Sequence, residues 1–547
     1  MTTGIRHRLG HALGWLERLA SRPLGAVVLF ALGLAVYAVR AVGWPLAGGR
    51  DLDEYLYGYI QFLDWHPLLP WSMLFRTPVT PIVAGLVLDV AGGTFAEPLI
   101  AVLFAASVVA WSAAARAFGA RVALLVAAAL LVYPAYGLMF HELSSEPLFA
   151  AGFALWAWLV TRAGEHPSVE RFALAGLGVA LLALIRPGNA VLLSFALFPL
   201  VLPGPGRERL VRATAFLGAA LVPLAAWAVL NGARFGDYTL ARGGNAVIPF
   251  YRAFITDRIV APANGPASRR LARAVQQHLL TRDPYKAYGV TLHEVFSSGS
   301  FRIHEDLYLL SDQVFGWDTD YSVLRKAGIE AVRAKPGKYV SGVLHTVWQQ
   351  LSKSFFRAPP TKSRGHAQAN VAVKGRTLPA PTEGQPIPAG QSVWISRPDN
   401  SIRDVWTSAT RHHFVFEHPR DRPRFEAILR ERNSLFAALP DRRGNAALAH
   451  RLNQLSRWFP RPIIWIAIGL IGLALRRPRG GLTLVALALA ALLVIVFNAL
   501  GLFADPHFAL PVAPAFVLLG AGALLGTRSQ RTRLTAGATS RHRRRNT

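Results

Sequence analysis

A short run of acidic and aromatic residues follows the first long apolar stretch of the chain and reads RDLDEYLY over residues 50–57. A carboxylate beside a substrate hydroxyl can accept its proton and so turn the oxygen into a nucleophile. We predict that Asp53 is such a general base, with Asp51 as the alternative and Glu54 beside them. The alternative without catalysis is a solvated loop or a helix N-cap, where Asp is common.

Three further polar segments interrupt apolar stretches: FHELSSEP at 140–147, RPG at 186–188 and DPHFALP at 505–511. A charge between apolar runs is costly unless it meets an anion, an acid or water, and a guanidinium suits phosphate. We predict Arg186, Arg76 and His141 as phosphate ligands. Without a site, the arginine would reach toward water, the Glu-Pro pair would begin a helix and the tyrosines would be interfacial. The predicted substrate-binding residues share a place in these loops and are Tyr55, Tyr57, Glu142, Glu146, Asp505 and His507.

The composition is that of a membrane protein, because 52% of the 547 residues are hydrophobic. The formal net charge of +28 would suit a nucleic acid, but the arginines gather in short loops between apolar stretches and in the C-terminal tail. This distribution is typical of a topology signal beside membrane lipids, so we predict no nucleic-acid partner. There is no cysteine, which excludes disulfides and thiolate metal sites.

Standard cofactor motifs are absent from the sequence. It contains no phosphate-binding loop, no dinucleotide fingerprint and no His-Glu-x-x-His motif, so we predict no metal-ligand residues and no cytosolic nucleotide-driven reaction, and we assign no cofactor. A divalent cation (Mg, Mn or Ca) that bridges acids and a phosphate is the one addition that the chemistry leaves open.

Apolar stretches of sufficient length predict about ten membrane spans. Arginine clusters alternate with acidic loops along them, which places both termini in the cytoplasm and the acidic loops outside. The segment 77–93 is short and broken by prolines, and we predict an interfacial or re-entrant helix there. The predicted spans lie at about 23–42, 94–116, 121–140, 146–162, 171–186, 188–203, 210–231, 461–476, 481–502 and 508–526.

These spans divide the chain into four parts. We expect a polytopic α-helical membrane protein with a mainly helical extracytoplasmic domain inserted before the last three spans. Within that domain, helical patterns cover 269–280, 322–335 and 422–439, and a loop rich in Pro, Gly and Ser covers 359–390. The predicted parts are a transmembrane module 1–231 with a first outer loop 44–93, a soluble domain 232–459, C-terminal transmembrane helices 460–527 and a basic cytoplasmic tail 528–547.

The order of these pieces resembles the GT-C superfamily of integral-membrane glycosyltransferases. It is most similar to the branch that contains protein O-mannosyltransferases, the aminoarabinose transferase acting on lipid A and actinobacterial arabinofuranosyltransferases. The resemblance covers roughly residues 20–231, with a weaker echo at 461–526. Its pieces are Asp53-Glu54 after the first span, the segment 77–93, Ser145-Glu146-Pro147 at the start of a span, Arg186, and His507 to Pro511 before the last span.

The resemblance implies an inverting hexosyl- or pentosyltransferase that takes a sugar from a polyprenyl-phosphate donor. The acceptor would be a cell-envelope glycan, lipid or protein at the outer face of the cell membrane, and the base would be Asp53. Family members often carry Lys in place of Arg186 and Arg-Tyr in place of His507-Phe508, which affects the phosphate ligands more than the base. A membrane transporter, a lipid-linked polysaccharide ligase or polymerase, and a non-catalytic assembly factor are the alternatives.

Overall fold

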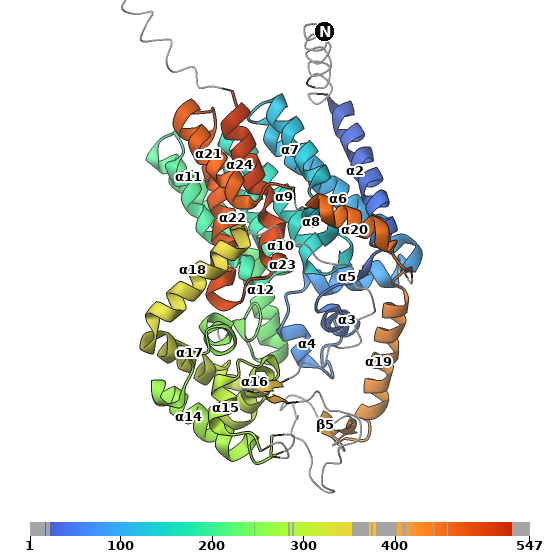
Figure 1. Ribbon diagram of the computed structural model, residues 1–547, viewed down its shortest axis with the longest axis vertical. Coiled ribbons are helices and arrows are strands. Elements are labelled where there is room, and N and C mark those ends of the chain that lie inside the picture. The colour runs from blue at the N-terminus through green and yellow to red at the C-terminus, as the bar shows by residue number, and fades with distance from the viewer. Residues whose placement is uncertain are drawn as a thin grey trace, which may run out of the picture.

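The structure is a computed structural model that describes residue 17 and residues 22–527, without 245–246, 283–284, 287–288, 353–370, 374–375, 379–401, 407–411, 417, 441 and 457. It is mostly helical and has two parts, a bundle of apolar helices and a smaller domain at one end of it (Figure 1). This is the polytopic α-helical membrane protein that the sequence predicts. The predicted basic tail 528–547 and most of the predicted loop 359–390 lie outside the described residues.

Four helices of the bundle are long and apolar enough to cross a membrane, namely α2 (Pro23–Gly43), α6 (Gly92–Arg116), α12 (Gly206–Phe235) and α22 (Gly481–Gly501). The count of ten spans stays a prediction. Proline explains two of the breaks between bundle elements, before Pro134 and before Pro187, because it removes a backbone donor and clashes with the preceding turn. The other bundle elements are α7 (Ala120–Val132), α8 (Pro134–Met139), α9 (Ser145–Glu165), α10 (Val169–Ile185), η1 (Pro187–Leu197), α11 (Phe198–Val201), α21 (Pro462–Arg476), α23 (Pro506–Ala509), η6 (Leu510–Val512) and α24 (Pro514–Leu525).

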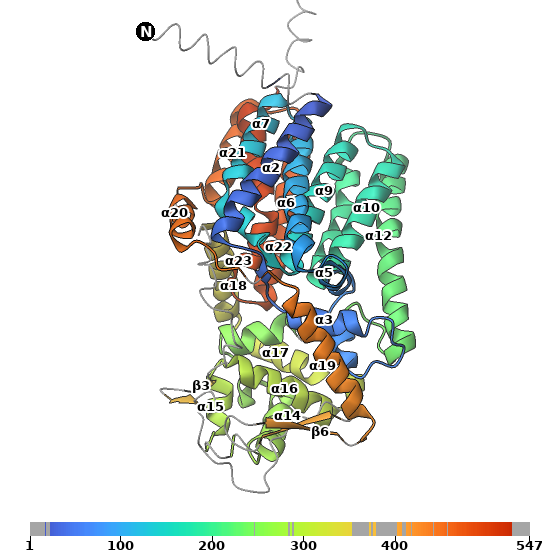
Figure 2. The same cartoon turned by 90° about the vertical axis from the view of Figure 1, so that its right-hand side faces the viewer.

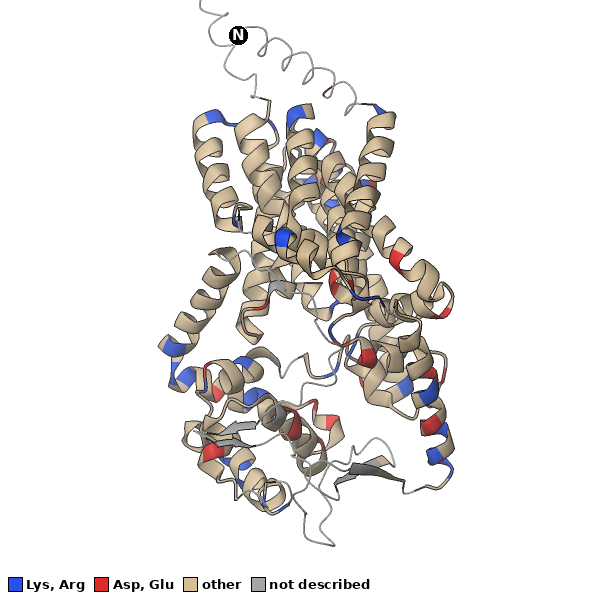
Figure 3. Cartoon of the chain, turned by 45° about the vertical axis from the view of Figure 1, so that its right-hand side comes forward, with Lys and Arg blue, Asp and Glu red and all other residues tan. Residues whose placement is uncertain are grey.

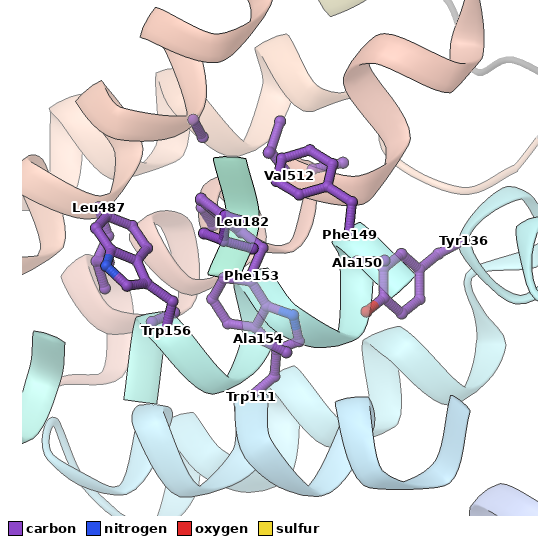
Figure 4. Packing of buried hydrophobic residues seen from close by; sticks show 14 of the residues in the cluster. Trp111, Tyr136, Phe149, Ala150, Phe153, Ala154, Trp156, Leu182, Leu487 and Val512 are labelled. Atoms are coloured by element: carbon purple, nitrogen blue, oxygen red, sulfur yellow. The ribbon is translucent and has the colours of Figure 1, made fainter. Parts of the chain in front are cut away.

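Aromatic side chains fill the centre of the bundle (Figure 4). Phe153 on α9 has its ring centroid 6.0 Å from Trp111 on α6 and 5.3 Å from Trp156, and all three are fully buried. Small residues bring other helices close together. A Cβ atom at Gly33 on α2 would lie 2.9 Å from the Cα of Ala105 on α6, so only glycine permits this approach.

The first outer loop forms three short helices, α3 (Leu52–Ile60), α4 (Pro70–Leu74) and α5 (Val79–Asp89). The helix α5 covers most of the segment predicted as an interfacial or re-entrant helix and ends at Asp89, well short of a full span. Two-residue strands β1 (Ala47–Gly48) and β2 (Glu142–Leu143) pair in parallel. This pairing joins the first outer loop to the loop between α8 and α9.

The segment predicted as an extracytoplasmic domain, residues 232–459, is mainly helical, while its bounds as a domain stay a prediction; we call it the outer domain. The helical patterns at 269–280, 322–335 and 422–439 are confirmed. Its elements are η2 (Val247–Thr256), η3 (Pro262–Asn264), α14 (Pro266–Ala274), η4 (Val275–Leu279), α15 (Leu292–Ser297), α16 (Phe301–Phe315), η5 (Trp317–Thr319), α17 (Ser322–Ala334), α18 (Pro336–Ser352), α19 (Asp421–Ala437), α20 (Ala446–Ser456), and the antiparallel strand pairs β3 (Val371–Val373) with β4 (Arg376–Leu378) and β5 (Ile402–Trp406) with β6 (His412–Phe416).

The outer domain packs at the end of the bundle that also carries the first outer loop (Figures 1 and 2). The start of α2 and the end of α24 lie at the opposite end. Basic side chains mark several helix ends there, far from the outer domain (Figure 3). This arrangement agrees with the predicted alternation of loops, whereas the side of the membrane on which each end lies stays a prediction.

Candidate active site

A cavity of about 960 Å³ lies between the bundle and the outer domain. We name its two halves by the residues that line them. The charged residues of the bundle end are Arg50, Asp51, Glu54, Arg76, Glu146 and Arg186. The polar and aromatic residues of the outer-domain end include Arg242, Tyr251, Phe301, His304, Glu305, Asp306, Tyr308, Asp312, Trp317 and Tyr321.

The strand pair β1–β2 holds the acidic segment at the cavity. The backbone N–H of Gly49 donates to the carbonyl oxygen of Leu143 (3.1 Å), and a side chain at Gly49 would collide with this strand. Asp51 follows as the N-cap of α3 with a φ of 60°, in the left-handed region that residues other than glycine seldom occupy. Such backbone conformations are found preferentially at functional sites.

The geometry of α3 separates the two candidate bases. Asp51, Glu54 and Tyr55 line the cavity. Asp53 lies one residue before Glu54 on α3, is turned by about 100° from it at 3.6 residues per turn, and does not line the cavity. The structure thus brings the alternative, Asp51, into the site in place of the preferred Asp53.

Arg76 connects the acids of α3. Its Nη2 atom lies 2.6 Å from Glu54 Oε2 and 3.1 Å from Asp51 Oδ2, and its guanidinium lies 5.7 Å from the centroid of the Tyr55 ring. Burial opposes the charge of Arg76, but the two carboxylates outweigh it and hold its pKa above the ordinary value. A permanent cation therefore lies beside the candidate base.

Arg50 lies between the first and the last outer loops. Its guanidinium is 3.9 Å from Asp51 and 3.7 Å from Asp505, and it faces the rings of Phe503 and Phe508 at 5.9 and 5.7 Å. The sequence analysis did not select Arg50. Its position directly before the acidic run is the signal that could have identified it.

A second buried network joins three segments that are far apart in the sequence. Glu146 is 2% exposed, and its Oε1 atom lies 3.2 Å from His507 Nδ1 and 3.6 Å from Arg186 Nη1. Arg186 also donates to the backbone carbonyl oxygen of His507 (3.2 Å). His507 in turn lies 3.7 Å from Asp505. The structure therefore brings together four residues that the sequence predicted separately.

Other predicted residues lie away from the cavity. His141 is 3% exposed and stacks on Tyr37 with centroids 4.2 Å apart. Burial, followed by the nearby charge of Arg40, lowers the pKa of His141 to about 3. The buried neutral imidazole does not line the cavity, so the role of His141 as a phosphate ligand stays a prediction that this geometry does not favour.

Two predicted sugar contacts also point elsewhere. The Tyr57 hydroxyl accepts a hydrogen bond from Arg432 Nη1 on α19 (2.6 Å), while Glu142 lies in β2. Of the six predicted substrate-binding residues, Tyr55 and Glu146 line the cavity, and Asp505 and His507 reach it through their partners Arg50 and Arg186.

The outer-domain end contains residues that sequence reasoning missed. Arg242 is buried, with Nη2 2.7 Å from Asp312 Oδ1 and Nη1 3.4 Å from Asp237 Oδ2, and its guanidinium stacks 3.4 Å from the centroid of the Trp317 ring. Tyr321 donates to the other oxygen of Asp312 (2.8 Å). No motif in residues 232–459 marked these residues, because only the fold brings them to the cavity.

Within the described ranges, no group of three or more His, Cys, Asp or Glu side chains has the arrangement of a metal site. The acids at the bundle end face arginines instead, as the pairs of Arg76 with Asp51 and Glu54 show. The donor set of this part of the chain thus does not fit the divalent cation that the sequence left open.

Comparison with protein families gives a match to part of the chain. The model of the family described as dolichyl-phosphate-mannose-protein mannosyltransferase matches residues 76–230. The match confirms the resemblance to the GT-C superfamily. It runs from Arg76 through most of α12, and it supports the coarse prediction of a membrane glycosyltransferase. The acidic run at 50–57 precedes the matched residues.

Two crystal structures of ArnT from Cupriavidus metallidurans are similar to this chain. The one bound to undecaprenyl phosphate has 14% sequence identity and a TM-score of 0.35, over 92% of this chain and 78% of that chain. The apo structure has 13% identity and a TM-score of 0.32, over 94% and 78%. Comparison with curated proteins gives no match.

Proposed function

We propose that the protein is an inverting glycosyltransferase that moves a sugar from a polyprenyl-phosphate donor to a hydroxyl of a cell-envelope acceptor. The observation that carries the proposal is the bundle end of the cavity, where Asp51 lies with Arg50, Arg76 and Arg186. The match of residues 76–230 to a family named for a polyprenyl-phosphate sugar supports the donor class.

In the proposed reaction, a bond forms on one face of the anomeric carbon of the sugar while another bond breaks on the opposite face. Asp51 accepts the proton of the acceptor hydroxyl as its oxygen forms a bond to the anomeric carbon. The bond from that carbon to the phosphate oxygen breaks on the opposite face, and the polyprenyl phosphate leaves with the electron pair. Attack opposite to the leaving group inverts the anomeric configuration. We prefer Asp51 to Asp53 because Asp51 lines the cavity.

The arginines stabilise the leaving group in this proposal. Negative charge grows on the phosphate as the bond breaks, and preorganised cations lower the energy of that transition state. Arg186 can present two N–H groups to phosphate oxygens, and Glu146 holds its guanidinium in place. Arg76 and Arg50 add charge from the side of the base.

The location follows from the same topology. We propose that the outer domain and the first outer loop face the outside of the cell membrane and that both termini lie in the cytoplasm, as the arginine distribution predicts. A polyprenyl donor stays in the bilayer, so its phosphate reaches the cavity from the bundle. The acceptor then enters from the outer domain.

The test uses the full-length protein in nanodiscs with polyprenyl-phosphomannose or polyprenyl-phosphoarabinofuranose labelled in the sugar. We expect the label to pass from one of these donors to an acceptor in a cell-envelope extract, with inversion visible by NMR. Absence of transfer from both donors, or retention of configuration, would contradict the proposal. Uptake of labelled donor into sealed vesicles without cleavage would favour the transporter alternative.

A further inference from the structure

The outer-domain end of the cavity contains polar groups that no atom of the described residues satisfies. Both ring nitrogens of His304 lack a hydrogen-bond partner, and so does the buried hydroxyl of Tyr308. His304 is 5% exposed, and both residues line the cavity from α16. A buried polar group without a partner is costly, so groups of this kind point to a ligand that completes their hydrogen bonds.

Aromatic rings surround these two residues. The ring centroid of His304 lies 4.7 Å from those of Tyr251 and Tyr308 and 6.3 Å from that of Phe301. Phe301 is 45% exposed and lines the same wall. Aromatic walls with a few convergent polar groups are typical of small-ligand sites, and ring faces attract the C–H groups of a sugar.

The charge of this end selects against an anion. Among the described residues, its lining has one basic residue, Arg242, and three acids, Glu305, Asp306 and Asp312. Arg242 pairs with Asp312 and Asp237. Acids thus outnumber basic residues in this part of the lining, so we expect a phosphate or carboxylate on the ligand to be disfavoured.

The protonation of His304 fits a hydroxyl. Burial lowers the pKa of His304 to about 3, so the ring is neutral at physiological pH. A neutral imidazole has one donor and one acceptor nitrogen, and a hydroxyl group can both donate and accept. Tyr308 offers the same pair of capacities through its own hydroxyl.

We propose that the outer-domain end is a subsite for a neutral, hydroxyl-rich sugar of the acceptor, with His304 and Tyr308 as its hydrogen-bonding groups. The assignment of this sugar to the acceptor rests on the proposed function. The subsite lies across the same cavity from Asp51, so a sugar held there can present a hydroxyl to the base.

Binding without donor or turnover tests this subsite separately from the reaction. The full-length protein in nanodiscs is titrated with octyl mannoside, octyl arabinofuranoside and octyl mannoside 6-phosphate, and affinity is measured by microscale thermophoresis. We expect a neutral glycoside to bind, the phosphorylated one to bind at least about tenfold more weakly, and Tyr308→Phe to weaken the neutral glycoside by about tenfold. His304→Phe should have a similar effect, while undecaprenyl phosphate binding stays unchanged in both variants.

Tyr339→Phe is the matched control. The Tyr339 hydroxyl donates to the carbonyl oxygen of Leu500 (2.6 Å) and does not line the cavity, so the same chemical change there should leave glycoside affinity unaltered. The proposal is overturned if no neutral glycoside binds, if the phosphorylated glycoside binds as tightly, or if Tyr308→Phe binds like the wild type. Transfer can still occur in each of these cases, and a failure of transfer leaves the binding result valid.

Discussion

The two ends of the cavity use charge in different ways. At the bundle end, three arginines and three acids share two networks, a partly exposed one around Arg50 and Arg76 and a buried one around Glu146. At the outer-domain end, the buried Arg242 pairs with Asp312 and Asp237 through its Nη atoms, while His304 and Tyr308 keep unsatisfied polar groups. A charged leaving group suits the first environment and a neutral hydroxylated ligand the second. The division indicates that donor chemistry and acceptor recognition lie in different parts of the chain.

The largest expected effect tests which acid acts at the bundle end. Asp51→Asn should lower transfer by about a hundredfold, because an amide cannot accept the acceptor proton. Asp53→Asn is the matched control on the same helix, and its turnover should stay within about threefold of wild type, since Asp53 does not line the cavity. Normal turnover by Asp51→Asn together with an inactive Asp53→Asn would return the role of base to Asp53.

Much of the bundle end was predictable from the sequence because its residues stand out locally. Four charged residues stand beside apolar stretches, where a charge is costly and therefore rare, namely Asp51, Arg76, Glu146 and Arg186. The choice between Asp51 and Asp53 was not predictable, since it depends on where α3 begins and on the left-handed backbone of Asp51. Periodicity does not fix an N-cap to within two residues.

The residues of the outer-domain end could not be predicted from the sequence, for a different reason. Arg242, His304, Tyr308 and Asp312 occupy different elements of a domain without a motif, and ordinary buried residues have the same composition. Their meaning comes from tertiary packing, which brings them to one wall. The same holds for His141, whose burial against Tyr37 depends on the pairing of β1 with β2.

A smaller effect is expected from substitutions of Arg186, which we propose binds the donor phosphate. Arg186→Gln should slow transfer by about tenfold to a hundredfold, because the charge on the leaving phosphate is greatest in the transition state. Arg186→Lys should recover part of the rate, since it keeps the charge and loses the two-pronged geometry. Single-turnover rates at saturating donor measure this step. Equal losses in both variants, together with lower melting temperatures, would make Arg186 a structural residue.

The buried ion pair of Arg242 with Asp312 at the outer-domain end should contribute more to stability than the pair of Arg50 with Asp505 at the bundle end. Asp312→Asn leaves Arg242 buried with a poorer partner and should destabilise the outer domain by about 3 kcal/mol. Asp505→Asn removes a longer, more exposed contact with Arg50 and should cost less than about 1 kcal/mol. Chemical denaturation followed by protease resistance of the outer domain compares them. Similar losses in the two variants would remove the distinction between the ends.

The weakest expected effect is a pH dependence of stability that arises from His304 at the outer-domain end of the cavity. The folded pKa of His304 is about 3, below its ordinary value of 6.5, so the unfolded chain binds a proton more readily. Stability from the neutral ring is present above about pH 6.5 and decreases as the pH falls toward 3. The melting temperature of the wild type should therefore fall relative to that of His304→Phe as the pH is lowered from about 6.5 toward 3. A constant difference between them would contradict this assignment.

Steady-state kinetics with both substrates test the division of the cavity most directly. Arg186→Gln should raise the KM for the polyprenyl-phosphate donor and leave the KM for a neutral glycoside acceptor unchanged. Tyr308→Phe should do the reverse, with about a tenfold rise for the acceptor alone. If both variants change the KM of the same substrate, or change both KM values together, the two ends of the cavity do not serve the donor and the acceptor separately.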